Sequence, residues 1–172
     1  MTIQLGQPLP DLEVTVIEDG APVRRVQSAR LFTNARVLLF AVPGAFTPTC
    51  SDHHLPGYVQ HFPAFQSRGI DVLGMAVNDA YVMQAWAAVQ QVPAGMKLLA
   101  DGNASLTRAL GLELDGTAYG MGLRARRFAL YAENGVVRQL HVEAPGEFRV
   151  STAEAMLQAI AAQEAGAPAG AD

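Results

Sequence analysis

The sequence has few of the residues that would build a disulfide framework or a metal centre. Its 172 residues include one cysteine, Cys50, so neither an internal disulfide nor a thiolate-rich metal site can form. The four histidines do not replace the missing thiolates, because His141 lies far from the other three along the sequence and none stands in an H-E-x-x-H pattern. We therefore expect neither a metal nor another cofactor.

Charge and long apolar runs are also scarce. Only 16% of the residues are charged while 50% are hydrophobic, so a single core can form and disorder is disfavoured. The formal net charge of −4 disfavours nucleic-acid binding, which needs a basic surface. No run approaches the roughly 18 apolar residues of a membrane span. Residues 1–5 have neither the basic nor the apolar region of a signal peptide, so we expect a cytoplasmic location.

Strands and helices alternate along the sequence, which is typical of an α/β domain with parallel strands at its centre. Apolar runs predict strands over residues 12–16, 36–42, 70–77, 97–100, 127–132 and 136–142. Helical spacing or capping residues predict helices over 49–68, from a cap at Asn78 or Asp79 to about Gln90, from a cap at Asp101 or Asn103 to Gly111, and from 151 onward. The glycine-rich segment 116–122 is predicted to be a loop.

Local signals sharpen these boundaries. Pro56 predicts a kink or a broken first turn in the helix that follows Cys50. Asn134-Gly135 predicts a type I′ turn, and the pattern from Ser151 to Glu154 predicts a capping box. The hairpin makes the sheet mixed, so we expect a single α/β domain over residues 1–164 and a disordered tail over 165–172.

Cys50 is the strongest candidate for chemistry. It follows the buried strand 36–42 at the start of a helix, and ligand sites of open α/β sheets form outside the carboxyl ends of the strands. The positive end of the helix dipole favours the thiolate form there. Thr47 can place a hydroxyl near the sulfur, while Pro43 and Pro48 stiffen the loop. A buried, unreactive Cys50 is the alternative interpretation.

The segment from Pro43 to Ser51, PGAFTPTCS, resembles the active-site signature of the peroxiredoxins, Pro-x-x-x-Thr-x-x-Cys. Together with His54-Leu55-Pro56-Gly57 it is similar to the type-II subfamily, which includes mammalian peroxiredoxin five. The similarity continues through residues 77–80, Trp86, 98–101, 127–128 and 135–137. The resemblance implies a thioredoxin-like fold with extra N-terminal strands, flanking helices and a mixed central sheet.

The resemblance also implies roles for individual residues. Cys50 matches the peroxidatic cysteine, and Thr47 matches the hydroxyl that orients the peroxide. Pro43 matches the proline that shields the thiolate, and Arg127 matches the arginine that activates it. Fixed donors from Thr47, Arg127 and the main chain would stabilise the charge on the departing oxygen. The signature residues expected to contact substrate are Gly44, Phe46 and Thr49.

Two assignments stay open. Arg124 or Arg126 could share the role of Arg127, although a strand would point Arg126 and Arg127 in opposite directions. Cys50 and His54 lie four residues apart, which is also compatible with a cysteine hydrolase. Because peroxide reduction needs no histidine, we interpret His54 as a helix-surface or capping side chain.

The sequence departs from mammalian relatives, which resolve the oxidised cysteine with a second one, because residues 147–151 contain none. We therefore expect a one-Cys thiol peroxidase that reduces hydrogen peroxide and organic hydroperoxides through a Cys50 sulfenic acid. An external thiol would regenerate it, with glutathione or glutaredoxin favoured and thioredoxin as the alternative. The expected role is antioxidant defence and redox homeostasis, in a homodimer by resemblance. A redox sensor or holdase with poor turnover is a further alternative.

Overall fold

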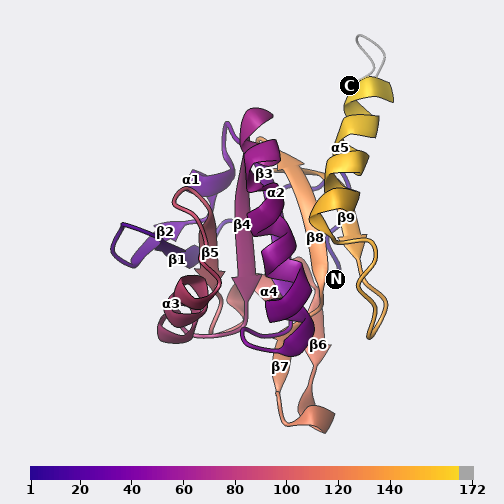
Figure 1. Ribbon diagram of the computed structural model, residues 1–172. Helices are drawn as coiled ribbons and strands as arrows, with labels where there is room; N and C mark the ends of the chain where they lie inside the picture. The colour runs from indigo at the N-terminus through magenta and orange to yellow at the C-terminus, as the bar shows by residue number, and fades with distance from the viewer. Residues whose placement is uncertain (167–172) are drawn as a thin grey trace.

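The protein is built around one mixed sheet of seven strands in the order β2-β1-β5-β4-β3-β8-β9 (Figure 1). The structure, a computed structural model, describes residues 1–166. Strands β5, β4 and β3 run parallel to one another at the centre of the sheet. Each strand farther out pairs antiparallel with its inner neighbour. The bounds are β1 (Glu13–Glu18), β2 (Arg24–Gln27), β3 (Arg36–Val42), β4 (Ile70–Ala76), β5 (Lys97–Ala100), β8 (Phe128–Glu133) and β9 (Val136–Val142). A separate two-stranded sheet pairs β6 (Glu113–Asp115) with β7 (Leu123–Ala125).

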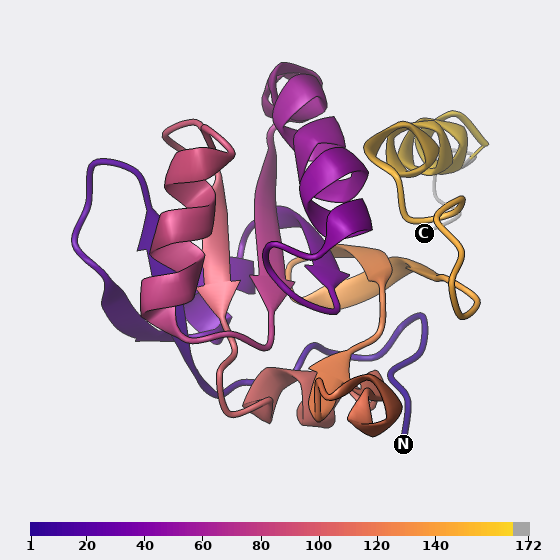
Figure 2. The same ribbon diagram turned by 60° about the horizontal axis from the view of Figure 1, so that its bottom comes forward.

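Helices cover both faces of the large sheet (Figure 2). They are α1 (Ala29–Phe32), α2 (Leu55–Ser67), α3 (Ala80–Val89), α4 (Ser105–Leu110) and α5 (Ala153–Gly166), with a π-helical turn η1 (Cys50–His54) and a 3-10 turn η2 (Thr117–Tyr119). Helices α2, α3 and α5 lie on one face, and α4 lies with β6 and β7 on the other. Within residues 1–166, no helix is long and apolar enough to cross a membrane.

The pleat of β3 divides the core between these faces, because successive side chains of a strand point to opposite sides. Leu38, Phe40 and Val42 pack in a cluster with residues of α2, α3 and α5. Leu39 and Ala41 pack in a second cluster with residues of α4. Every residue of β3 after the first is buried, as its continuous apolar run predicts.

The expected fold is confirmed in its main features. All six predicted strands are present, and the order of elements is the predicted one. Asp79 caps α3 by accepting a hydrogen bond from Val82 N at 2.9 Å. Asn134 and Gly135 have φ values of 50° and 76°, the left-handed pair that a type I′ turn requires.

Some local predictions differ from the structure. The sequence did not reveal β2, β6 or β7, and the segment predicted as a loop over 116–122 includes η2 and joins the hairpin strands β6 and β7. Thr152 Oγ1, rather than Ser151, accepts from a first-turn amide of α5, that of Ala155. Helix α5 continues to Gly166, so the expected disorder is wrong for the first two residues of the tail; residues 167–172 lie outside the described part of the chain.

Candidate active site

The segment that follows β3 is tied to two neighbouring elements. Asn78, just after β4, accepts a hydrogen bond from Ala45 N through Oδ1 at 2.9 Å. The indole of Trp86 in α3 donates to Ser51 Oγ at 3.0 Å, on the residue after Cys50. Trp86 is a buried core side chain that also holds this segment. The backbone around Cys50 is thus fixed from both sides.

Gly44 lets a guanidinium approach this segment closely. A Cβ atom on Gly44 would lie 2.8 Å from Arg124 Nη1 and 3.3 Å from Thr47 Cγ2, too close for any larger residue without displacement. Arg124 donates to Pro43 O at 3.4 Å and to Met121 O at 2.8 Å. Arg124, which the sequence left as an open alternative, therefore lies against the predicted active-site loop.

Thr47 is held by the loop itself. Its Oγ1 donates to Gly44 O at 2.7 Å, which uses the one hydroxyl proton. Two lone pairs remain, so this hydroxyl can accept a hydrogen bond from the O–H of a bound peroxide but, in this geometry, cannot donate one to the departing oxygen. The expectation that Thr47 is a donor to that charge is therefore corrected.

The helix after this loop contains a π-helical turn near its start. Cys50 is the first residue of η1, and the α-helical part begins at Leu55, one residue before Pro56. The predicted break near Pro56 is confirmed. Pro56 is the second residue of α2, so its missing N–H falls where the π-helical and the α-helical parts of the helix meet.

His54 is fully buried, which contradicts its interpretation as a surface or capping residue. Its Nδ1 lies 3.0 Å from Arg127 Nη1, and its Nε2 lies 3.1 Å from Ser151 O. A guanidinium can only donate, so Nδ1 must accept and Nε2 must carry the proton. Burial, together with the positive charge of Arg127, lowers the pKa of His54 to about 3. The imidazole is therefore neutral and fully engaged, and it cannot act as the base of a hydrolase.

Arg127 lies just before β8, with its guanidinium against two aromatic side chains. One is His54, and the other is Phe148, whose ring centroid lies 5.8 Å from the guanidinium carbon. Arg126 and Arg127 fall between β7 and β8 rather than within a strand. The predicted alternation therefore does not apply, and both side chains line the same cavity.

Glu143 organises the loop that carries Phe148. Its carboxylate accepts from the main-chain amides of Arg149, Val150 and Ser151 at 2.8–2.9 Å, and from Ser151 Oγ at 2.7 Å. Burial alone would raise the pKa of Glu143, but these hydrogen bonds outweigh it and lower the pKa. Because Ser151 O in turn accepts from His54, the loop is connected to Arg127 through one buried imidazole.

A cavity of about 340 Å³ opens beside this arrangement. Pro43 and Thr49, which flank the loop leading to Cys50, line one part, and Arg126 and Arg127 line another. Of the predicted substrate contacts, Thr49 lies in this cavity and Gly44 lies beneath Arg124. Phe46 is 51% exposed with a φ of 66°, a strained conformation for a residue other than glycine.

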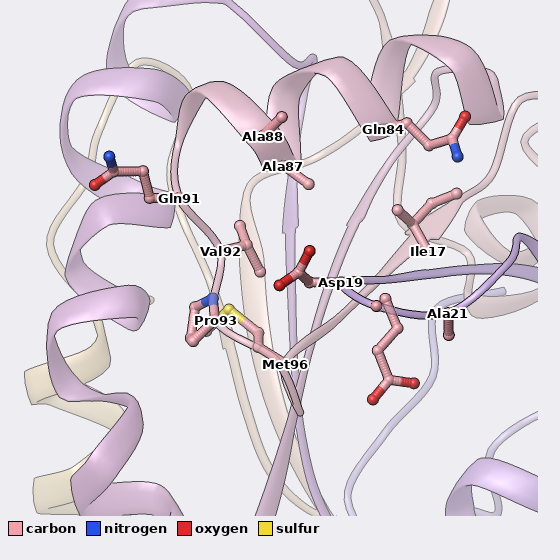
Figure 3. Close-up of a pocket in the computed structure, with 12 residues that line it drawn as sticks. Ile17, Asp19, Ala21, Gln84, Ala87, Ala88, Gln91, Val92, Pro93 and Met96 are labelled. Atoms are coloured by element: carbon pink, nitrogen blue, oxygen red, sulfur yellow. The ribbon is translucent and has the colours of Figure 1, made fainter.

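Another hollow lies at the opposite end of the parallel strands (Figure 3). It is formed by the end of β1 with Asp19 and by the end of α3 with Gln91, close to Met96 before β5. Figure 3 shows its carboxylate and amide side chains but no nucleophile among the labelled residues. The carboxyl end of β3, where Cys50 follows, is thus the better candidate.

The fold and the position of the cysteine define the class of protein. The family model described as Redoxin matches residues 4–157, and the mixed sheet with flanking helices is a thioredoxin-like peroxiredoxin fold. Among solved structures, the reduced Prx3 of Vibrio vulnificus in complex with H2O2 has a TM-score of 0.85 and 44% identity, covering 92% of this chain and 99% of that one.

Curated relatives are similar over the same length. The rice (Oryza sativa subsp. japonica) protein "Peroxiredoxin-2E-2, chloroplastic" is 44% identical over 92% of this chain and 73% of its own length. The Arabidopsis thaliana "Peroxiredoxin-2C" is 40% identical over 92% of this chain and 98% of its own length. The chain belongs to the peroxiredoxin family and is a thiol-dependent peroxidase. Its one cysteine fits a one-Cys, type-II member.

Proposed function

We propose that Cys50 is the peroxidatic nucleophile. A thiol peroxidase needs a reactive sulfur, and the single cysteine of the chain is the observation that carries this assignment. The thiolate attacks one peroxide oxygen, an S–O bond forms, and the O–O bond breaks. The departing oxygen takes a proton and leaves as water or an alcohol, and Cys50 becomes a sulfenic acid.

Arg127, Thr47 and Pro43 assist this step. The Arg127 guanidinium, held by His54, favours the thiolate and stabilises the negative charge on the departing oxygen. Thr47 Oγ1 accepts a hydrogen bond from the peroxide O–H and so orients the O–O bond. Pro43 covers one side of the cavity and limits access of water. Arg124, against Pro43 O, adds positive charge to the same loop.

The reduction of the sulfenic acid uses an external thiol, because no second cysteine exists in the chain. Glutathione or glutaredoxin is the proposed donor, with thioredoxin as the alternative. A homodimer in the cytoplasm is the proposed setting. Phe46 and Tyr119, 51% and 84% exposed on loops around the site, support a contact between copies there.

Steady-state peroxide consumption with glutathione, glutaredoxin and thioredoxin systems side by side tests this proposal. We expect turnover with glutathione or glutaredoxin, and its complete loss in Cys50→Ser, because a serine hydroxyl is not ionised near neutral pH. The melting temperature of Cys50→Ser should match that of the parent protein. Peroxide turnover retained in this variant would remove the assignment, and oxidation without turnover by any donor would favour a redox sensor.

A further inference from the structure

The cavity beside Cys50 has an apolar part and a cationic part. Leu114, Tyr119 and Pro145 contribute apolar surface, while Arg126 and Arg127 contribute guanidinium groups. Pro43 and Thr49 place one edge of the cavity next to the backbone of Cys50. A small molecule that fills this cavity would therefore contact apolar side chains and guanidinium groups, and it would lie next to the backbone of Cys50.

The charge of Arg126 is not matched by a carboxylate. Its side-chain hydrogen bond goes from Nη2 to the main-chain oxygen of Glu143, at a long 3.5 Å. Among residues 1–166, no carboxylate lies within ion-pair distance of the Arg126 guanidinium. This half-buried cation can therefore bind an anionic group from solution.

The acidic residues around the cavity do not compete for Arg126. The Glu143 carboxylate is surrounded by three main-chain amides and the Ser151 hydroxyl. Glu147 pairs with Arg149 at 3.8 Å. The lining thus carries two guanidiniums and two carboxylates, and both carboxylates are engaged with partners other than Arg126.

The catalytic cycle consumes two molecules of a reducing thiol for each peroxide. With one cysteine per chain, a first thiol RSH must reach the sulfenic acid, so that an S–S bond forms, the S–O bond breaks and water leaves. A second RSH must then attack the mixed disulfide, which releases RSSR and returns Cys50 as a thiol. Binding RSH beside Cys50 speeds the first of these steps by raising its local concentration.

We propose that this cavity binds a small thiol that carries a carboxylate, and that Arg126 recognises the carboxylate. The inference rests on the proposed function of Cys50 and names the chemical class of its reductant. Leu114 and Pro145 contact the carbon chain of the thiol, and Arg126 orients it. Arg126 is thus a specificity-determining residue for the reductive half of the cycle.

Small thiols of similar size, with and without a carboxylate, test this role. The pre-oxidised protein is mixed with 3-mercaptopropionate or with 3-mercaptopropanol. The ratio of second-order rate constants, carboxylate thiol over neutral thiol, is measured for each variant. Arg126→Gln should lower this ratio by about tenfold, because a charge-assisted hydrogen bond is lost. Arg126→Lys should lower it less, since the charge remains.

Arg138→Gln is the matched control. Arg138 is an exposed arginine that pairs with Glu133 at 3.7 Å, at the other end of β8, and its loss should leave the ratio unchanged. An unchanged ratio in Arg126→Gln, or the same fall in Arg138→Gln, would overturn the proposal.

A carboxylate could also belong to the peroxide. Oxidation of the reduced protein by a fatty-acid hydroperoxide is therefore compared with oxidation by tert-butyl hydroperoxide. A ratio that falls in Arg126→Gln for hydroperoxides but not for thiols would assign the cavity to the oxidant and contradict the proposal. Failure of the Cys50 assignment is seen separately, as peroxide turnover in Cys50→Ser.

Discussion

The arginine side chains at the two ends of the β3–β8 strand pair have different kinds of partner. At the amino end of β3, Arg36 donates to Tyr131 Oη at 2.7 Å and pairs with the carboxylates of Glu133 and Glu164. At the carboxyl end, Arg124 donates to main-chain carbonyls, and Arg127 contacts the neutral imidazole of His54. Both ends hold their guanidiniums by several contacts, and the contacts described within residues 1–166 include carboxylates at the first end.

This difference separates stability from chemistry. A guanidinium matched by carboxylates contributes to folding and has little electric field left for a substrate. A guanidinium held by carbonyls and an imidazole is oriented without being neutralised, so its field can act on a thiolate or a departing oxygen. We infer that the carboxyl end keeps positive charge for catalysis and the amino end uses it for structure.

Replacing arginine by methionine should affect catalysis at the carboxyl end of β3 and stability at its amino end. Arg127→Met should slow peroxide attack by about 10²- to 10³-fold and raise the pKa of the Cys50 thiol, because charge stabilisation is lost. Arg36→Met should leave both unchanged and lower the free energy of unfolding by about 1–2 kcal/mol. Stopped-flow oxidation, thiol titration and urea unfolding measure these effects. A silent Arg127→Met with a crippled Arg124→Met would transfer the role to Arg124.

Removing a single hydroxyl at each end should separate catalysis from stability in the same way, with smaller effects than the arginine substitutions. Thr47→Val keeps the shape but removes the acceptor for the peroxide proton, and should slow peroxide attack by about tenfold or more while affecting reduction by thiols less. Tyr131→Phe removes the hydroxyl that binds Arg36 and Glu133, and should lower stability by about 1 kcal/mol without changing either rate. Equal slowing of both half-reactions by Thr47→Val would contradict a role specific to the peroxide.

The pH dependence of stability should reveal the buried His54. An unfolded histidine binds a proton below a pKa of about 6.5. The folded protein does not protonate His54 until its pKa of about 3, so the folded state binds fewer protons and stability falls as pH decreases between these values. The slope approaches about 1.4 kcal/mol per pH unit.

His54→Gln keeps an acceptor for Arg127 and a donor for Ser151 O, but does not titrate, so this slope should disappear in urea unfolding measured from about pH 7 to 5. His53→Gln, at an exposed position on the same turn, is the control and should keep the slope. Superimposable curves for the parent and His54→Gln would show that His54 is not buried in the neutral form.

The sequence predicts most of the sheet because its inner strands are continuous apolar runs. It does not predict β2, whose residues Arg24–Gln27 are mostly polar, or β6 and β7, which have three residues each next to many glycines. Such short or polar strands depend on pairing with a neighbour rather than on their own apolar pattern.

The candidate site can likewise be predicted only where it depends on residues that are close in the sequence. The position of the site after β3 can be predicted from the local sequence, because the segment around Cys50 contains a buried strand, two prolines and the start of a helix. The burial of His54 and its contacts with Arg127 and Ser151 do not follow, because the partners are 73 and 97 residues away. The π-helical turn at Cys50–His54 also breaks the α-helical spacing on which the surface interpretation of His54 depends.

The most direct test of the one-Cys mechanism is the mass of the protein after one equivalent of peroxide without any donor thiol. With a single cysteine, the oxidised sulfur has no partner in its own chain, and two Cys50 residues could join only if their Cα atoms came within about 7 Å. We expect a mass gain of one oxygen atom and no covalent dimer on a non-reducing gel. Prior addition of glutathione should instead give a mixed disulfide at Cys50 and protect it from further oxidation by excess peroxide. Rapid, stoichiometric formation of a Cys50–Cys50 dimer would contradict the mechanism.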